Sequence, residues 1–520
     1  MEFLDFDKLG SAKVLENAKR EGLHELLDEK RVDEAEIKLG GGLTYNYASM
    51  PVGKEVLDAL SEFSKEADLV GKYKLLLSGE MMNTGEKRLV LHHLTRGNVL
   101  GTPVVWEGED KEAFYKGELE KIKDFAEKVH SGKITGSTGK KFTSVCQIGI
   151  GGSDLGPRAL YMALKGYERK MEAYFISNVD PDDAAEVIKH LDFETTLFVL
   201  VSKSGTTQET LTNRDLVLKT LESSPVKGLD PKKHMVSVTS KTSPLAKDES
   251  MLESFFIDDF IGGRYSSTSM VGGVVLSLAY GYKTFSEILE GAHEEDVLST
   301  CDDIHKNGAL MDALIGVYLG NVLGYRATAI LPYSQALSRF PAHLQQLDME
   351  SNGKSVNRFG EKITYKTGPV IFGEPGTNGQ HSFYQLLHQG SDIVPLQFVG
   401  FRESQYGFDT VTDGSTSQEK LNANLAAQIV AFALGKDDEN ENKKFYGERP
   451  SSLIYGKKLT PKALGALLAH FENKVMFQGF AWNLNSFDQE GVQLGKVLAK
   501  EVLKGSKGNP VLAKYASKLI

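Results

Sequence analysis

The chain has 520 residues, of which 41% are apolar and 25% charged, a composition typical of globular proteins rather than of disordered or low-complexity chains. This length exceeds what one hydrophobic core usually serves, so more than one domain is predicted. The formal net charge of −10 argues against a nucleic-acid-binding protein, which would need a broad basic face. A small anionic ligand stays possible, because a few local amides and cations can hold a phosphate in an acidic protein.

The cysteines, the N-terminus and the apolar runs bear on the compartment. Cys146 and Cys301 are the only cysteines, so we expect no disulfide framework and no structural zinc site. No basic segment followed by an apolar one opens the chain, and the apolar runs at 270–280 and 425–434 are too short to span a membrane. The sequence therefore predicts a cytoplasmic protein without a membrane partner.

The predicted elements divide the chain into an α/β protein with helical ends. The first hundred residues show helical spacing with mixed charge. Short apolar runs at 145–150, 174–177, 197–201 and 234–238 each precede a helix or turn, which is typical of a parallel sheet buried on both faces. Runs at 327–331, 370–372 and 393–398 predict a second such sheet, after a helical bridge at 284–323, and the last hundred residues look mainly helical. The predicted boundaries are 1–110 for a helical N-terminal segment packed on the second domain, 111–283 for the first domain, 284–500 for the second, and 501–520 for a helical tail.

Two loops follow predicted strands of the first domain and open helices. The first, Gly149–Pro157, has glycines that let backbone amides approach an anion, while Asp154 stands where a dinucleotide fingerprint needs glycine. The second, Ser202–Thr210, offers several hydroxyls, one ammonium and a helix start, which suits a phosphate monoester. Neither loop forms a Walker A motif. Taken alone, each could also be a turn or a capped helix without a ligand.

Four further residues could carry proton chemistry. Glu350 follows Gln346 by one helical turn, so both can reach one small molecule. Arg264 follows Gly262–Gly263 and could stabilise an oxyanion. His381 ends a glycine-rich loop, where it could carry a proton, and Lys496 lies on a predicted helix. Each has a structural alternative, such as a solvated carboxylate or a surface ion pair.

Together these residues suit an aldose–ketose isomerase. A phosphate anchor would hold the far end of the substrate, and a carboxylate would move a proton beside a carbonyl. Arg264 would offset the enediolate charge, and a His or Lys would move protons on oxygen. This chemistry needs neither a metal nor a redox cofactor, so none is expected.

The chain closely resembles the glucose-6-phosphate isomerase family over nearly its whole length. The matching segments are Ile148–Pro157, Ser202–Thr210, Gly262–Ser266, Gln345–Lys354, Gly373–His381 and Ser486–Gln489. The resemblance implies two sugar-isomerase (SIS) domains, a homodimer with active sites at the subunit interface, and the interconversion of glucose 6-phosphate and fructose 6-phosphate in glycolysis and gluconeogenesis.

The resemblance also implies a role for each site residue. Glu350 would be the base between carbons 1 and 2, and Arg264 would steady the cis-enediolate. His381, supplied by the neighbouring subunit, and Lys496 would serve ring opening. The sugar hydroxyls would contact Gln346 and Gln489. The phosphate would be held by Gly152, Ser153, Ser202, Lys203, Ser204 and Thr207.

Four positions depart from the family pattern: Gly85, Gly205, Leu347 and Glu490. None removes a proposed catalytic group, but the pocket's shape, and with it the tolerance of mannose 6-phosphate, is left open. A non-catalytic sugar-phosphate sensor is the alternative from another class. A sensor would need the loop after Ser202 but would have no use for Glu350, His381 and Lys496 together.

Overall fold

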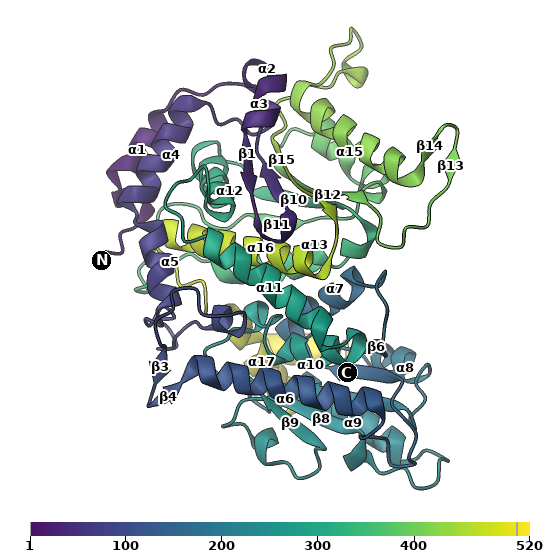
Figure 1. Ribbon diagram of the computed structural model, residues 1–520. Helices are drawn as coiled ribbons and strands as arrows, with labels where there is room; N and C mark the ends of the chain where they lie inside the picture. The colour runs from purple at the N-terminus through teal and green to yellow at the C-terminus, as the bar shows by residue number, and fades with distance from the viewer. Residues whose placement is uncertain (1, 506–507) are drawn as a thin grey trace.

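The computed structural model describes residues 2–505 and 508–520. Residues 506 and 507, within the predicted C-terminal tail, and Met1 lie outside the described residues. Two sheets dominate the fold, one in each half of the molecule, and long helices pack between them (Figure 1).

The first sheet is wholly parallel, with the strand order β6-β5-β7-β8-β9. Its central strands are buried on both faces because their residues are apolar in near-continuous runs. Helices α8 and α9 pack on one face, and α6, α7 and α10 on the other. The elements are α6 (Lys111–Ser131), β5 (Ser144–Ile148), α7 (Leu155–Ala163), β6 (Glu172–Ile176), α8 (Pro181–Ile188), β7 (Thr196–Val201), α9 (Gln208–Glu222), β8 (Met235–Thr239), β9 (Glu253–Phe256) and α10 (Met270–Tyr280).

The second sheet has the strand order β1-β2-β15-β12-β10-β11 and is mainly parallel. β10, β11, β12 and β15 run parallel, whereas β2 pairs antiparallel with β15 and β1 pairs antiparallel with β2. The N-terminal segment thus completes the second sheet. The strands are β1 (Glu36–Lys38), β2 (Thr44–Asn46), β10 (Ala327–Tyr333), β11 (Val370–Phe372), β12 (Leu396–Glu403) and β15 (Ser451–Lys458).

The remaining helices surround the second sheet and join the two halves. α16 (Pro461–Ala481) is buried along almost its whole length, between α11 (Tyr282–Leu298) and α12 (Gly308–Val317), and lies near the middle of the molecule (Figure 1). The other helices and short strands are α1 (Gly10–Asn17), α2 (Leu23–Leu26), α3 (Glu29–Glu34), α4 (Lys54–Glu66), α5 (Leu69–Leu77), β3 (Val105–Trp106), β4 (Glu109–Asp110), α13 (Phe340–Leu344), α14 (Tyr384–Gln389), β13 (Val411–Thr412), β14 (Ser415–Thr416), α15 (Ser417–Leu434), α17 (Gln493–Leu503) and α18 (Pro510–Ala516).

The predicted α/β class and the two SIS-type sheets flanked by helices are confirmed. Every strand predicted in either domain is present, within a few residues of its expected place. β1, β2, β9 and β15 were not predicted, because three- or four-residue strands give no periodicity and β15 has polar residues at both ends. In the part of the chain that the structure describes, no helix combines the length and apolar character that crossing a bilayer requires.

Candidate active site

Arg264 is the most deeply buried charged group of the site. It lies in a short 3-10 turn, Gly263–Tyr265, between the first sheet and α10, and only 1% of its surface is exposed. A buried guanidinium needs an acceptor for each N–H. Nε donates to Ser351 Oγ at 2.6 Å, and Nη2 donates to the carbonyls of Ser486 and Asp488 at 2.7 and 3.0 Å. The remaining nitrogen, Nη1, donates to Glu350 Oε2 at 3.2 Å and to Gln489 Oε1 at 3.0 Å.

Glu350 lies on a π-helical turn, Gln345–Glu350, that continues α13. Single π turns inside helices are frequent at functional sites. Gln346 and Glu350 are four residues apart and share one side of the turn, as the sequence predicts. The Glu350 side chain is 24% exposed, at a cleft that it lines with Gln489 and Arg358.

A second cation, Lys354, supports the turn from its C-terminal end. Its ammonium pairs with Asp488 Oδ1 at 3.0 Å and donates to the carbonyl of Ser351 at 2.9 Å. Burial lowers the pKa of Lys354, and Asp488 opposes that shift. Lys354 thus ties the segment after Glu350 to the loop that carries Gln489. Sequence reasoning assigned Lys354 no role of its own; its place at the end of the Gln345–Lys354 segment, which carries Glu350, was the available signal.

The glycine-rich loop after β5 touches the Arg264 turn. Gly151–Ser153 form a 3-10 turn, and a Cβ on Gly152 would lie 2.2 Å from the carbonyl carbon of Gly263. Only glycine allows this approach. Ser153 and Arg264 are therefore brought into one region by backbone contact between two glycine loops. Gln346 also reaches this loop, since its Nε2 lies 3.4 Å from the position of a Cβ on Gly151.

The second polar loop, Ser202–Thr207, connects β7 to α9. The Ser202 and Thr207 hydroxyls lie 3.1 Å apart, and the Gly205 amide donates to Ser202 Oγ at 3.1 Å. Thr207 is the N-cap residue of α9, but its side chain caps no amide of that helix. Ser204 is exposed and accepts hydrogen bonds from Thr206. The loop thus presents hydroxyls at the start of a 15-residue helix, which favours an anion.

The Lys203 side chain turns away from these hydroxyls. Its ammonium donates to the carbonyls of Ile261 at 3.1 Å and Asp259 at 3.5 Å, and burial lowers its pKa. The ammonium thus joins the hydroxyl loop to the segment that leads into Arg264.

A sequence model of the phosphoglucose isomerase family matches residues 46–518. This chain belongs to the phosphoglucose isomerase family. A glucose-6-phosphate isomerase of Treponema denticola is 63% identical over 513 residues, which are 97% of each chain. One from Borreliella afzelii is 49% identical over all of this chain and 99% of its own length. The crystal structure of a glucose-6-phosphate isomerase from Chlamydia trachomatis, 42% identical, covers 99% of both chains with a TM-score of 0.93.

In this member of the phosphoglucose isomerase family, the single chain brings together part of the predicted site. Arg264, Glu350 and Gln489 are in direct contact, and the glycine loop with Ser153 adjoins them. His381 and Lys496 are exposed, on the turn Asn378–His381 and on α17. Within residues 2–505 and 508–520, neither side chain hydrogen-bonds to Arg264 or Glu350. Sequence reasoning missed Ser351 and Tyr265, whose hydroxyls lie 3.0 Å apart behind Arg264.

Proposed function

We infer that this chain catalyses the reversible isomerisation of glucose 6-phosphate and fructose 6-phosphate, as an intramolecular aldose–ketose isomerase of glycolysis and gluconeogenesis. The observation that carries the inference is the contact of Arg264 Nη1 with both Glu350 and Gln489 at the cleft. This contact supports a carboxylate base and a cation that act on the same two substrate carbons.

Proton transfer is assigned to Glu350. In the open-chain aldose, its carboxylate takes the proton from carbon 2, and the electron pair of that C–H bond forms the double bond of a cis-enediolate. The charge that develops on oxygen is stabilised by Arg264, whose guanidinium is already oriented by its five acceptors. The carboxyl of Glu350 then returns the proton to carbon 1, a proton moves between the two oxygens, and the ketose results.

Phosphate binding is assigned to the two loops of the first domain. Ser202, Ser204 and Thr207 supply hydroxyls at the start of α9. Gly152 and Ser153 contribute from the glycine-rich loop after β5. Lys203 contributes through its backbone and through the positive charge near the loop, because its ammonium is engaged by two carbonyls. Contacts with the sugar hydroxyls are assigned to Gln346 and Gln489.

Ring opening is assigned to His381 and Lys496, with His381 acting in the site of a partner subunit. What supports a homodimer is the set of large apolar side chains left exposed on this protomer. Phe408 is 93% exposed and Tyr406 71%, both in the loop before the hairpin β13–β14, and Leu494 of α17 is 68% exposed. Large exposed apolar side chains of this kind can mark protein–protein interaction sites. We also place the enzyme in the cytoplasm, which suits the two free cysteines.

The experiment is the conversion of fructose 6-phosphate by the purified protein, with glucose 6-phosphate detected through a coupled dehydrogenase. Glu350→Gln keeps the shape of the side chain but cannot accept the proton, so kcat should fall by about 10³-fold or more while KM changes little. Retained turnover in this variant would remove Glu350 from the mechanism. Tight binding of the sugar phosphate by the wild type without any turnover would instead support the sensor.

A further inference from the structure

The π turn that carries Glu350 has a second polar face. Residues two apart on a helical turn point to opposite sides, so Asp348 points away from Gln346 and Glu350. Asn352, four residues after Asp348, shares this back face and donates through Nδ2 to the Val475 carbonyl of α16 at 2.9 Å. The front of the turn therefore carries the proposed base, and the back faces α16.

Asp348 is almost fully buried. It is 6% exposed, and its Oδ1 atom has no hydrogen-bond partner among the described residues. An unpartnered buried carboxyl is costly, and in a native fold such a group calls for an explanation.

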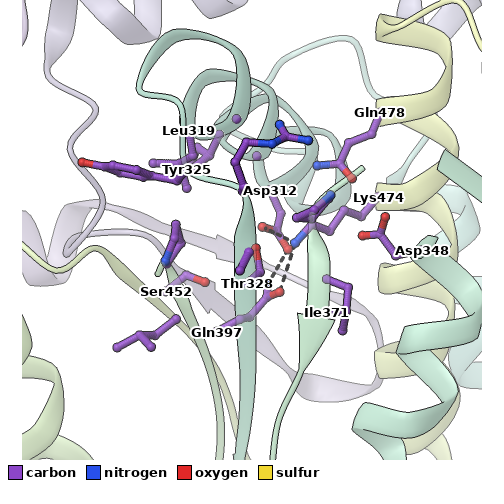
Figure 2. A pocket seen from close by; sticks show the side chains of 18 of the residues that line it. Asp312, Leu319, Tyr325, Thr328, Asp348, Ile371, Gln397, Ser452, Lys474 and Gln478 are labelled. Carbon is purple, nitrogen blue, oxygen red and sulfur yellow. Dashed lines mark hydrogen bonds and ion pairs between the residues drawn. The ribbon is translucent and has the colours of Figure 1, made fainter. Parts of the chain in front are cut away.

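The Asp348 side chain lines a cavity of about 40 Å³. The cavity lies where α12 and α16 meet the amino ends of β10, β11, β12 and β15, and Figure 2 shows Asp348 beside Lys474 and Gln478 of α16. This volume has room for one or two water molecules. Asp312, Gln397, Ser452, Lys474 and Gln478 are among the polar groups that share the cavity with Asp348, and Tyr325, Arg326, Thr328 and Thr367 line it as well.

Lys474 links two of these polar groups. The Lys474 ammonium donates to Gln397 Oε1 and to Asp312 Oδ1, each at 3.0 Å. Ser452 Oγ and Gln478 Oε1 have no hydrogen-bond partner among the described residues. Burial raises the pKa of Asp348 to about 7; Lys474 opposes this shift and Asp312 adds to it. Near neutral pH, the carboxyl can thus both accept and donate a hydrogen bond across the cavity.

We propose that Asp348 is a positioning residue for Glu350: through one or two water molecules in this cavity, its carboxyl ties the back of the π turn to the polar groups that line the cavity, which fixes the direction in which the front presents the base. In a π turn, i→i+5 hydrogen bonds replace the i→i+4 bonds of an α-helix, and because such turns are rare and short, we expect side-chain contacts to help to hold this one in place. Asn352 provides one anchor with defined partners, and Asp348 provides the other. The proposal rests on the proposed isomerase function.

The test compares Asp348→Ala with Asp348→Asn in fructose 6-phosphate turnover. Loss of the anchor should lower kcat at least about tenfold with KM within about threefold, since the phosphate loops lie on another domain. The Asn side chain keeps the shape and the hydrogen-bonding ends, so it should restore kcat to within about threefold of the wild type. If the role of Asp348 were purely structural, the melting temperature of both variants would fall, and kcat would not decrease selectively while KM stays nearly unchanged.

Asp302→Ala is the matched control, because the Asp302 side chain is 74% exposed and pairs only with Lys74. It should keep wild-type kcat. If Asp348→Ala does not fold, Asp348→Ser, which shortens the reach of the polar group, should show the same loss of kcat. A folded Ala or Ser variant with kcat within twofold of the wild type would overturn the proposal. Absence of turnover in the wild type would instead overturn the proposed function.

Discussion

At the scale of single residues, the site depends on how firmly Arg264 is held before any substrate arrives. The acceptors of its N–H groups come from the segment at 350–351 and from the loop at 486–489, so the guanidinium is held in one orientation. Fixed charges stabilise a developing oxyanion without reorganisation. The sequence predicted the cation because two glycines precede it. It could not predict Ser351 as the acceptor, because 87 residues separate the two.

Ser351→Ala should weaken catalysis through Arg264. Ser351 Oγ accepts from Nε at 2.6 Å and lies 3.0 Å from the Tyr265 hydroxyl. Removing it leaves a buried charged donor unpaired, which costs about 1.5–3 kcal/mol and predicts a loss in kcat of about ten- to a hundredfold. Steady-state kinetics with fructose 6-phosphate measure the effect. Ser286→Ala, which removes a hydroxyl from the surface of α11, should be neutral; an active Ser351→Ala enzyme would show that the other acceptors suffice.

At the scale of elements, apolar strands were predictable and loop contacts were not. The buried strands of both sheets are near-continuous apolar runs, which local sequence specifies. The contact of Gly152 with Gly263 joins two loops that follow different strands, and only the folded chain brings them together. The same holds for the π turn, since the sequence of α13 and its extension predicts an ordinary helix.

Gly152→Ala should separate the phosphate loop from the Arg264 turn. The added Cβ would lie 2.2 Å from the Gly263 carbonyl carbon, so backbone must move, at a cost of about 1–3 kcal/mol in unfolding free energy. We expect a lower melting temperature and a higher KM for fructose 6-phosphate. Gly117→Ala, in the middle of α6 with open space around the new Cβ, is the control. The control should leave KM unchanged and stabilise the helix by about 0.5–1 kcal/mol. An unchanged KM in Gly152→Ala would show that the loop at Gly152 does not take part in substrate binding.

At the scale of the whole molecule, two buried carboxyls near the centre should make stability depend on pH. Burial raises the pKa of Asp348 and of Glu472 to about 7, whereas an aspartate or glutamate in the unfolded chain ionises near 4. Between these values the folded chain holds protons that the unfolded chain releases. These two groups should therefore lower the free energy of unfolding as pH rises from 5 to 7, each by up to about 1.4 kcal/mol per pH unit. The buried His92, His93 and His343, whose pKa burial lowers, contribute in the opposite direction, because the unfolded chain holds protons there that the folded chain does not.

Asp348→Asn removes one of these two carboxyls and should therefore remove its contribution to the pH dependence of the unfolding free energy. The difference in melting temperature between this variant and the wild type, measured at pH 5, 6 and 7, should shift in favour of the variant as pH rises. Asp302→Asn, at an exposed position, should retain the wild-type slope. Equal slopes in all three proteins would mean that Asp348 is ionised to the same degree in the folded and unfolded chains.

Assembly of two subunits should be necessary for a complete site. Glu350 and Arg264 meet within one protomer, but His381 is exposed on the turn Asn378–His381. If His381 acts in the partner's site, mixed dimers of Glu350→Gln and His381→Leu subunits contain one site with both defects and one with neither. Unfolding and refolding an equal mixture of the two inactive variants should then restore about a quarter of wild-type activity, since half of the dimers formed at random are mixed.

The matched control is the same refolding of each variant alone, which should stay inactive because every site then carries one defect. Tandem mass measurement of the native dimers gives the mixed fraction to which recovered activity is compared. Activity that rises in proportion to that fraction shows that His381 acts across the interface. A mixture that forms mixed dimers without regaining activity would place His381 and Glu350 in the same subunit's site. The exposed turn would then have to fold toward the cleft of its own chain.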